Sequence, residues 1–287
     1  MKILTVDYHD TNAPEQFALS LQETGFGVLK NHPISWEKIQ AVYAEWLKFF
    51  YSDAKFNYQA SLSADSIDQN GYMPLEIAEK AKGATVRDIK EFYMLYFPHG
   101  RYPHEIGPLT RELFNELFAL GKTLLTWLEA HMPEAARQKL GQSLSSMLCM
   151  EQSQFRIIHY PGLTGDEELH AIRAAEHEDI NLITLLPAAT EPGLQVKGAD
   201  GAWIDVFPEP GTLIVNIGDM LQEATDFFYK STTHRVLNPA GTDKTKERLS
   251  MPLFLHPHPE VVLSDRYTAQ SYLMERLREL GTKKDKM

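Results

Sequence analysis

The feature that most constrains the fold of this chain is a succession of short, strand-like runs in its second half. The runs are rich in apolar and β-branched residues, and turn-forming pairs that contain glycine or proline separate them. They cover residues 155–160, 179–186, 193–196, 203–206, 212–216, 234–236 and 248–255. Many short strands at such spacing are typical of a β-sandwich or β-barrel.

Helical periodicity dominates before residue 150. Apolar residues at helical spacing predict helices between Pro14 and Gly25, between Ser35 and Phe50, and over 109–128, and a last helix is expected over 265–281. Shorter runs predict strands over 3–6, 27–30 and 88–97 and a turn over 71–74. Because no Ser/Gly/Pro-rich linker divides the halves, we predict one integrated unit of mixed α+β class. Residues 1–150 form a helical N-terminal region around a β-barrel or sandwich, 151–287, that ends in the last helix.

Composition excludes several classes of function. The chain has 287 residues, 43% of them hydrophobic, and a formal net charge of −11, so it lacks the basic surface that nucleic acids and anionic membranes attract. A single arginine can still hold a small anionic substrate. The one cysteine, Cys149, allows neither a disulfide within the chain nor a thiolate metal cluster. No signal peptide or membrane-length apolar run is recognisable, and we expect a soluble, cytoplasmic protein.

Three residues form a predicted metal-binding face. His177 and Asp179 are two positions apart, so on one strand both side chains point to the same side. His234 lies on another expected strand, which a barrel can place beside the first. Two imidazoles and one carboxylate leave positions open on a metal, as in non-haem Fe(II) oxygenases, although zinc accepts the same ligands. The competing interpretation is that each histidine is structural, since the chain contains 11 of them.

A predicted carboxylate clamp follows the metal face. Arg248 and Ser250 are again two positions apart and share one side of their strand. A guanidinium binds a carboxylate in bidentate fashion, and a serine hydroxyl adds another hydrogen bond. Tyr160 offers a phenolic donor to the same group. The alternatives are a structural arginine paired with a protein carboxylate and a tyrosine of the core.

Taken together, these motifs resemble the isopenicillin N synthase-like branch of the 2-oxoglutarate/Fe(II)-dependent dioxygenases. The resemblance spans nearly the whole chain, and its motifs stand in the family's order. They are the segments 23–34, 88–92, 177–186, 193–196, 203–206, 210–219, 231–236 and 248–250.

The resemblance implies a double-stranded β-helix, or jelly-roll, core with a helical N-terminal cover. It implies that His177, Asp179 and His234 are the catalytic metal ligands that hold Fe(II). It also implies that Arg248 and Ser250, with Tyr160, hold the distal carboxylate of 2-oxoglutarate. Such enzymes use O2 to couple oxidative decarboxylation of 2-oxoglutarate to hydroxylation, desaturation or cyclisation of a small-molecule substrate. One departure is Ile158, where many plant members carry an asparagine that contacts the co-substrate.

Other functions on the same scaffold stay open. Two relatives with the Arg-x-Ser pair, isopenicillin N synthase and aminocyclopropane-carboxylate oxidase, do not use 2-oxoglutarate. An oxidase independent of 2-oxoglutarate, an ethylene-forming enzyme and a non-catalytic metal-binding sensor are therefore the alternatives. The primary substrate is expected near Tyr72, Phe92 and Phe254, which as aromatic residues equally suit a core. The sequence sets neither that substrate nor the oligomeric state.

Overall fold

The computed structural model of the chain describes residues 2–60, 62–63, 66–67, 70–75, 87–168, 170–207, 209–239 and 244–279. The helices are α1 (Ala13–Thr24), α2 (Trp36–Tyr51), the 3-10 helix η1 (Asp53–Tyr58), α3 (Leu109–Ala130), α4 (Glu134–Arg137), α5 (Leu144–Met147), α6 (Asp219–Ala224) and α7 (Ala269–Glu279). The strands are β1 (Thr5–Asp7), β2 (Phe26–Lys30), β3 (Leu62–Ser63), β4 (Ser66–Ile67), β5 (Gly71–Met73), β6 (Glu91–Tyr96), β7 (Gln154–Tyr160), β8 (Ala174–His177), β9 (Ile183–Pro187), β10 (Leu194–Lys197), β11 (Trp203–Asp205), β12 (Leu213–Ile217), β13 (His234–Val236), β14 (Arg248–Ser250) and β15 (Leu253–Leu255).

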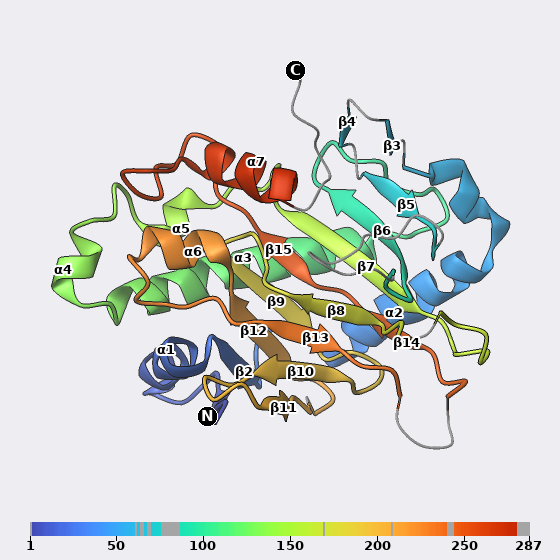
Figure 1. Cartoon of the computed structure of the whole chain (residues 1–287), viewed down its shortest axis with the longest axis horizontal. Coiled ribbons are helices and arrows are strands. Elements are labelled where there is room, and N and C mark those ends of the chain that lie inside the picture. The colour runs from blue at the N-terminus through green and yellow to red at the C-terminus, as the bar shows by residue number, and fades with distance from the viewer. Residues whose placement is uncertain are drawn as a thin grey trace.

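Two sheets form the centre of the molecule (Figure 1). In the described part of the chain, the larger sheet has nine strands in the order β1-β2-β12-β9-β15-β7-β6-β5, with β14 also paired to β7. The smaller sheet has four, in the order β11-β10-β13-β8. Every pairing within the two sheets is antiparallel except that of β1 with β2. The expected class of mixed α and β structure, with a β-rich second half, is confirmed.

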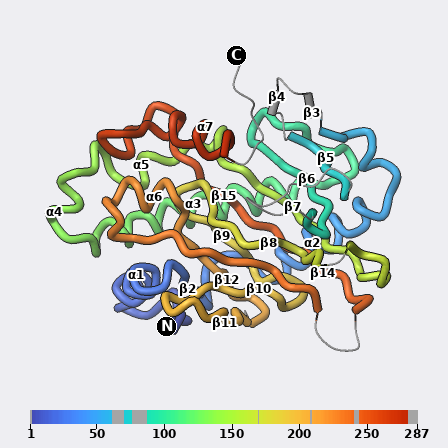
Figure 2. The backbone as a smooth tube through the Cα atoms, in the orientation of Figure 1, coloured from blue at the N-terminus to red at the C-terminus, as the bar shows by residue number. Residues whose placement is uncertain are grey.

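The first half of the chain does more than cover the barrel. Four of its strands, β1, β2, β5 and β6, belong to the same large sheet as the strands that follow residue 150. Figure 2 shows backbone segments from both halves of the chain side by side in this sheet. The turn expected over 71–74 is wrong, because Gly71–Met73 pairs with β6 as strand β5, and Pro74 follows directly after the pairing ends. The predicted strand 248–255 is broken between β14 and β15, since Pro252 has no N–H to donate to a ladder.

The two faces of the large sheet have different neighbours. On one face, α2 packs on β7 and α3 packs on β9 and β15, and the buried residues there merge with the helices into the main hydrophobic core. Side chains that alternate to the other face form two smaller apolar clusters. One cluster joins the two sheets, and the other gathers Met73, Phe92, Met94, Ile158 and Tyr160. We call this second face the inner face, because it is the one that the small sheet covers.

The helix boundaries follow the expected local signals. Helix α2 begins after Ser35, whose hydroxyl accepts a hydrogen bond from the Lys38 N–H. Helix α1 begins with Pro14 in its first turn and ends at Gly25, which adopts a left-handed conformation at φ 71°. The Gly25 N–H donates to the Leu21 carbonyl, so the glycine also closes the last turn.

Gly25→Ala should destabilise the protein more than an ordinary surface substitution. A Cβ atom there would lie 2.2 Å from Thr232 Oγ1 and 2.8 Å from the Lys230 carbonyl oxygen, in a backbone conformation that L-residues rarely adopt. We expect a loss on the order of 2 kcal/mol in the free energy of unfolding, measured by denaturant titration. Gly141→Ala is the matched control, because a Cβ atom at that position would have no other atom within 4 Å. Equal stability of the two variants would contradict this account.

No helix within the described ranges is both long and apolar enough to span a membrane.

Candidate functional site

Two of the three predicted metal-binding residues belong to the small sheet. His177 is the last residue of β8 and His234 is the first residue of β13, and the two stand directly opposite each other in the antiparallel pair. The prediction that Asp179 shares a strand with His177 is wrong, because β8 ends at His177 and β9 starts only at Ile183. Asp179 lies in the connection between them, where its carbonyl accepts a hydrogen bond from the Asp219 N–H.

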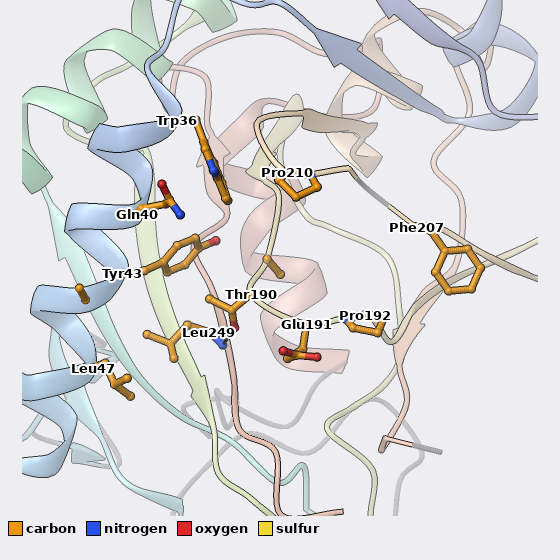
Figure 3. A pocket seen from close by; sticks show the side chains of 12 residues that line it. Trp36, Gln40, Tyr43, Leu47, Thr190, Glu191, Pro192, Phe207, Pro210 and Leu249 are labelled. Atoms are coloured by element: carbon orange, nitrogen blue, oxygen red, sulfur yellow. Dashed lines mark hydrogen bonds between the residues drawn. The ribbon is translucent and has the colours of Figure 1, made fainter. Parts of the chain in front are cut away.

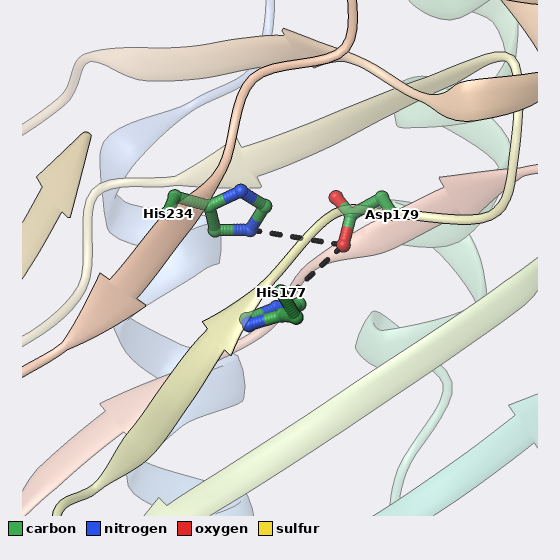
Figure 4. A group of neighbouring side chains, drawn as sticks. All are labelled: His177, Asp179 and His234. Atoms are coloured by element: carbon green, nitrogen blue, oxygen red, sulfur yellow. Dashed lines mark ion pairs between the residues drawn. The ribbon is translucent and has the colours of Figure 1, made fainter. Parts of the chain in front are cut away.

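The three side chains nevertheless meet at one point (Figure 4). Asp179 Oδ1 lies 3.8 Å from His177 Nε2 and 3.7 Å from His234 Nε2. One ligand atom from each residue lies within 4.8 Å of the other two. The imidazole ring centroids are 4.3 Å apart. An ion held between these three atoms receives two nitrogens and one oxygen from one side and keeps its other side open.

Hydrogen bonds select the histidine tautomers that a metal requires. His177 Nδ1 lies 2.8 Å from the Ala175 carbonyl oxygen, and His234 Nδ1 lies 3.1 Å from that of Thr232. A carbonyl only accepts, so each Nδ1 carries the proton and each Nε2 keeps its lone pair for an ion. Desolvation and the neighbouring His234 ring lower the pKa of His177, although 39% of its side chain is exposed. His177 is therefore neutral at pH 7.

The Asp179 carboxylate is held in position from behind. Its Oδ2 accepts hydrogen bonds from Thr184 Oγ1 at 2.5 Å and from Asn216 Nδ2 at 2.8 Å, which turns Oδ1 toward the imidazoles. Thr184 and Asn216 are directly opposed residues of β9 and β12 on the inner face. Burial opposes ionisation, but the two histidines and these two hydrogen bonds outweigh it and lower the pKa of Asp179. The carboxylate is thus charged at neutral pH.

Thr184→Val should weaken metal binding without removing a ligand. The change deletes the hydroxyl that orients Asp179 and also leaves Asn181 Nδ2 without the acceptor it now has. Loss of such a supporting group typically costs about 10- to 100-fold in metal affinity, and equilibrium dialysis against Fe(II) under anaerobic conditions measures it. Thr212→Val is the control, since Thr212 is equally buried but bonds the Glu209 carbonyl instead. Parental affinity in Thr184→Val would exclude an orienting role.

The predicted clamp residues lie on the inner face of the large sheet, the same face as Thr184 and Asn216. Phe254 stands opposite both Thr184 and Gln154, so the alternate residues of β7, which include Ile158 and Tyr160, point to the inner face. Arg248 stands opposite Tyr160 and Ser250 opposite Ile158, and they share this face. The structure therefore brings the three residues together, as the sequence predicted. Strand β14 with Arg248 and strand β13 with His234 nevertheless belong to different sheets.

Arg248 is a buried cation without an acidic partner among the described residues. The side chain is 2% exposed, its Nε donates to the Glu191 carbonyl, and its Nη1 has no hydrogen-bond partner. Its Cζ lies 5.1 Å from the centroid of the Tyr160 ring. No ion pair joins Arg248 to a carboxylate anywhere in the described ranges of the chain. Because an uncompensated buried charge is costly, this arrangement calls for an anionic ligand.

The aromatic residues expected near the substrate fall on different faces. Tyr72 stands opposite Tyr93 in the main core and donates a hydrogen bond to Glu91, which fits the alternative of a core aromatic residue. Phe92 and Phe254 do face inward. The Arg156 guanidinium lies over both of their rings, 4.5 Å and 5.3 Å from the centroids. Alternation along β5 would have shown that Tyr72 lies on a different face from Phe92 and Phe254, but this segment was expected to be a turn.

A cavity of about 610 Å³ lies elsewhere, between α2 and the segment that follows β9 (Figure 3). Trp36, Gln40 and Tyr43 line it from the helix, and Glu191 and Pro192 line it from the opposite side. It contains none of the predicted site residues. Leu249, which alternates with the clamp residues, reaches it from the outer face of β14, so this cavity is separate from the metal-binding face.

Comparison with known proteins places this geometry in a family. Residues 151–257 match the sequence model of the 2OG-Fe(II) oxygenase superfamily, and residues 7–114 match one described as non-haem dioxygenase in morphine synthesis N-terminal. The Arabidopsis thaliana protein DMR6-LIKE OXYGENASE 2 is 30% identical over 268 residues, which cover 90% of this chain and 74% of the relative.

Solved structures agree with the sequence relatives. A structure described as an oxygenase from Shewanella oneidensis is 50% identical with a TM-score of 0.87, and the match covers 98% of this chain and 99% of that one. A 2OG-Fe(II) oxygenase family protein from Caulobacter crescentus is 30% identical with a TM-score of 0.77, and the match covers 97% and 99% of the two chains.

The chain therefore belongs to the 2OG-Fe(II) oxygenase superfamily. It is a 2-oxoglutarate-dependent dioxygenase with the predicted jelly-roll core, and its cofactors are Fe(II) and 2-oxoglutarate. Two imidazoles and one charged carboxylate form a donor set that suits Fe(II) and leaves positions for other ligands.

Proposed function

We propose that this enzyme oxidises a small organic molecule at an Fe(II) ion held by His177, Asp179 and His234. Arg248, Ser250 and Tyr160 bind the distal carboxylate of 2-oxoglutarate. The observation that carries the proposal is the meeting of three ligand atoms within 4.8 Å, together with a buried arginine that has no carboxylate partner among the described residues. When bound, the metal and co-substrate supply the oxidising chemistry with O2.

The protein's own residues position and enclose the reactants. Thr184 and Asn216 fix the carboxylate of Asp179, and the Ala175 and Thr232 carbonyls fix the two imidazoles. The inner-face cluster around Phe92 and Ile158 keeps water from the space beside the clamp. We place the primary substrate against Phe92 and Phe254, where the Arg156 guanidinium provides a positive charge beside apolar rings.

Product analysis tests the proposal. Purified enzyme with Fe(II), 2-oxoglutarate and a library of small metabolites should consume O2 and release succinate, and a true substrate should increase both together. Oxidation of a substrate without succinate would instead indicate an oxidase independent of 2-oxoglutarate. Ethylene in the head space would indicate an ethylene-forming enzyme. Full metal occupancy without O2 consumption across the library would indicate a sensor.

We further propose that residues 1–150 and 151–287 act as one unit in the cytoplasm and that nucleic acid is not a partner. Strands from both halves in one sheet support the single unit, and a net charge of −11 argues against a nucleic-acid partner. Limited proteolysis and a filter-binding assay test them: separately stable halves, or DNA retention at physiological salt, would contradict them.

A further inference from the structure

A second arginine is buried beside the proposed co-substrate clamp. Arg173 directly precedes β8 in the small sheet, and its residue surface is 1% exposed, which makes it one of the largest fully buried side chains of the described chain. Its Cζ lies 5.9 Å from the centroid of the Tyr160 ring, and that of Arg248 lies 5.1 Å from the same ring. The two facing sheets thus each bring one guanidinium to a single tyrosine.

Neither guanidinium is paired with a carboxylate of the residues that the structure describes. Arg173 donates through Nη2 to the Lys246 carbonyl, and its Nε has no hydrogen-bond partner. Arg248 has only the Glu191 carbonyl as acceptor, and its Nη1 is without a partner. The carboxylate of Glu191, which is close enough to affect Arg173, is itself paired with Lys246 Nζ at 2.7 Å.

Two like charges in one buried compartment are unfavourable without a ligand. Burial lowers the pKa of Arg173, and the charge of Arg248 lowers it further. Within the residues that the structure describes, no ion pair of either arginine with a carboxylate compensates for this. Such an arrangement is stabilised when an anion enters and accepts the unused N–H groups.

We propose that Arg173 is a second cationic contact for the distal carboxylate of 2-oxoglutarate, which makes the anion site a pair of arginines with Tyr160 between the two sheets. The inference rests on the proposed co-substrate site and extends it to a residue outside the Arg-x-Ser pair. It assigns Arg173 to co-substrate specificity, because among 2-oxo acids only one with a second carboxylate satisfies both guanidiniums. A 2-oxo acid with a methyl group at that end leaves two buried charges unpaired.

The test compares 2-oxoglutarate with two analogues, each of which lacks one of its two binding groups. 2-Oxoglutarate has both the 2-oxo acid that chelates a metal and the distal carboxylate. Glutarate has the distal carboxylate but no 2-oxo acid. 2-Oxopentanoate chelates the metal but has a methyl group in place of the distal carboxylate. Dissociation constants are measured by calorimetry, with metal-free protein for glutarate and with anaerobic Fe(II)-loaded protein for the two oxo acids. We expect Arg173→Met to weaken 2-oxoglutarate and glutarate by about 10- to 100-fold and to leave 2-oxopentanoate unchanged.

Two further variants separate charge from packing. Arg173→Lys keeps the charge and should bind 2-oxoglutarate between the parent and Arg173→Met. Arg111→Met is the matched control, because Arg111 also lies over two aromatic rings, 5.0 Å and 5.8 Å from their centroids, but on the distant surface of α3. Arg173→Met should unfold without ligand at a temperature no lower than the parent, since it removes one of two like buried charges.

The outcomes distinguish this inference from the function on which it rests. Parental affinity of Arg173→Met for both dicarboxylates, together with weakened binding by Arg248→Met, overturns the inference alone. Equal weakening of all three ligands also overturns it, because a general distortion then explains the result. Failure of the parent to bind either dicarboxylate overturns the inference and the proposed co-substrate site together.

Discussion

Asp179→Ala should abolish turnover and lower the affinity for Fe(II) by at least about 100-fold. The substitution removes the only negatively charged group of the three ligands and leaves two imidazoles 4.3 Å apart by their ring centroids. It also removes the acceptor that Thr184 and Asn216 share, so both side chains lose a hydrogen-bond partner. Anaerobic equilibrium dialysis measures the affinity, and O2 uptake with 2-oxoglutarate measures the turnover.

The control is Asp205→Ala on β11 of the same small sheet. Asp205 also accepts a hydrogen bond from a side-chain amide, that of Gln195, but it is exposed and is not part of the metal-binding face. We expect parental Fe(II) affinity and turnover from it. Thermal unfolding without metal shows whether Asp179→Ala is folded. A folded Asp179→Ala that binds Fe(II) like the parent would remove Asp179 from the ligand set.

Arg248→Met should have the second largest effect and should act on the co-substrate rather than the metal. Removing one partner of a buried, hydrogen-bonded charge pair costs about 2 to 5 kcal/mol, so the dissociation constant of 2-oxoglutarate should rise by about 30-fold or more. Fe(II) affinity should not change, because Arg248 lies on β14 of the large sheet and the two histidines on the small one. Calorimetry with Fe(II)-loaded protein in the absence of O2 measures the dissociation constant of 2-oxoglutarate, and anaerobic equilibrium dialysis measures that of Fe(II).

Stability provides an independent readout for the same variant. Arg248 has no acid partner within the described part of the chain, and the methionine retains most of the apolar stem. We therefore expect Arg248→Met to be at least as stable as the parent in the absence of ligand. Unchanged 2-oxoglutarate affinity in a folded Arg248→Met would refute the role assigned to this residue.

Much of the fold was accessible from the sequence because local patterns and tertiary packing agree. Ser35, Pro14 and Gly25 mark helix ends by backbone chemistry that does not depend on the rest of the molecule. His234 was expected beside the first metal pair, and the register of β8 with β13 places it there. Arg248 and Ser250 lie two positions apart on a real strand, as predicted, and their role as a carboxylate clamp stays a prediction.

The errors come from tertiary contacts that leave no local trace. Strand β8 ends at His177, so Asp179 reaches the site from the connection that follows. Strand alternation therefore does not explain why Asp179 lies beside His177, although the two residues do meet. Strand β5 is only three residues long and exists through its pairing with β6. The turn-like composition of 71–74 therefore outweighed the strand signal, and the sequence did not show that Tyr72 faces the main core.

The supporting residues were missed although a signal existed. Thr184 and Asn216 are the only polar side chains in strands that are otherwise apolar, β9 and β12, and a lone polar residue in a buried strand requires a partner. Arg173 gave a weaker signal, because a single arginine before a strand is usually exposed. Only the three-dimensional proximity to Tyr160 and Arg248 identifies it.

The most direct test of the central claim is spectroscopic. Fe(II) and then 2-oxoglutarate are added to the protein without O2, and the visible metal-to-ligand charge-transfer band of a chelated 2-oxo acid is recorded. We predict that the parent develops the band, that Asp179→Ala does not, and that Arg248→Met develops it only at much higher 2-oxoglutarate concentration. Absence of the band in the parent with Fe(II) bound, or a band of parental strength in Asp179→Ala, would contradict the proposal that these side chains hold the metal and its co-substrate together.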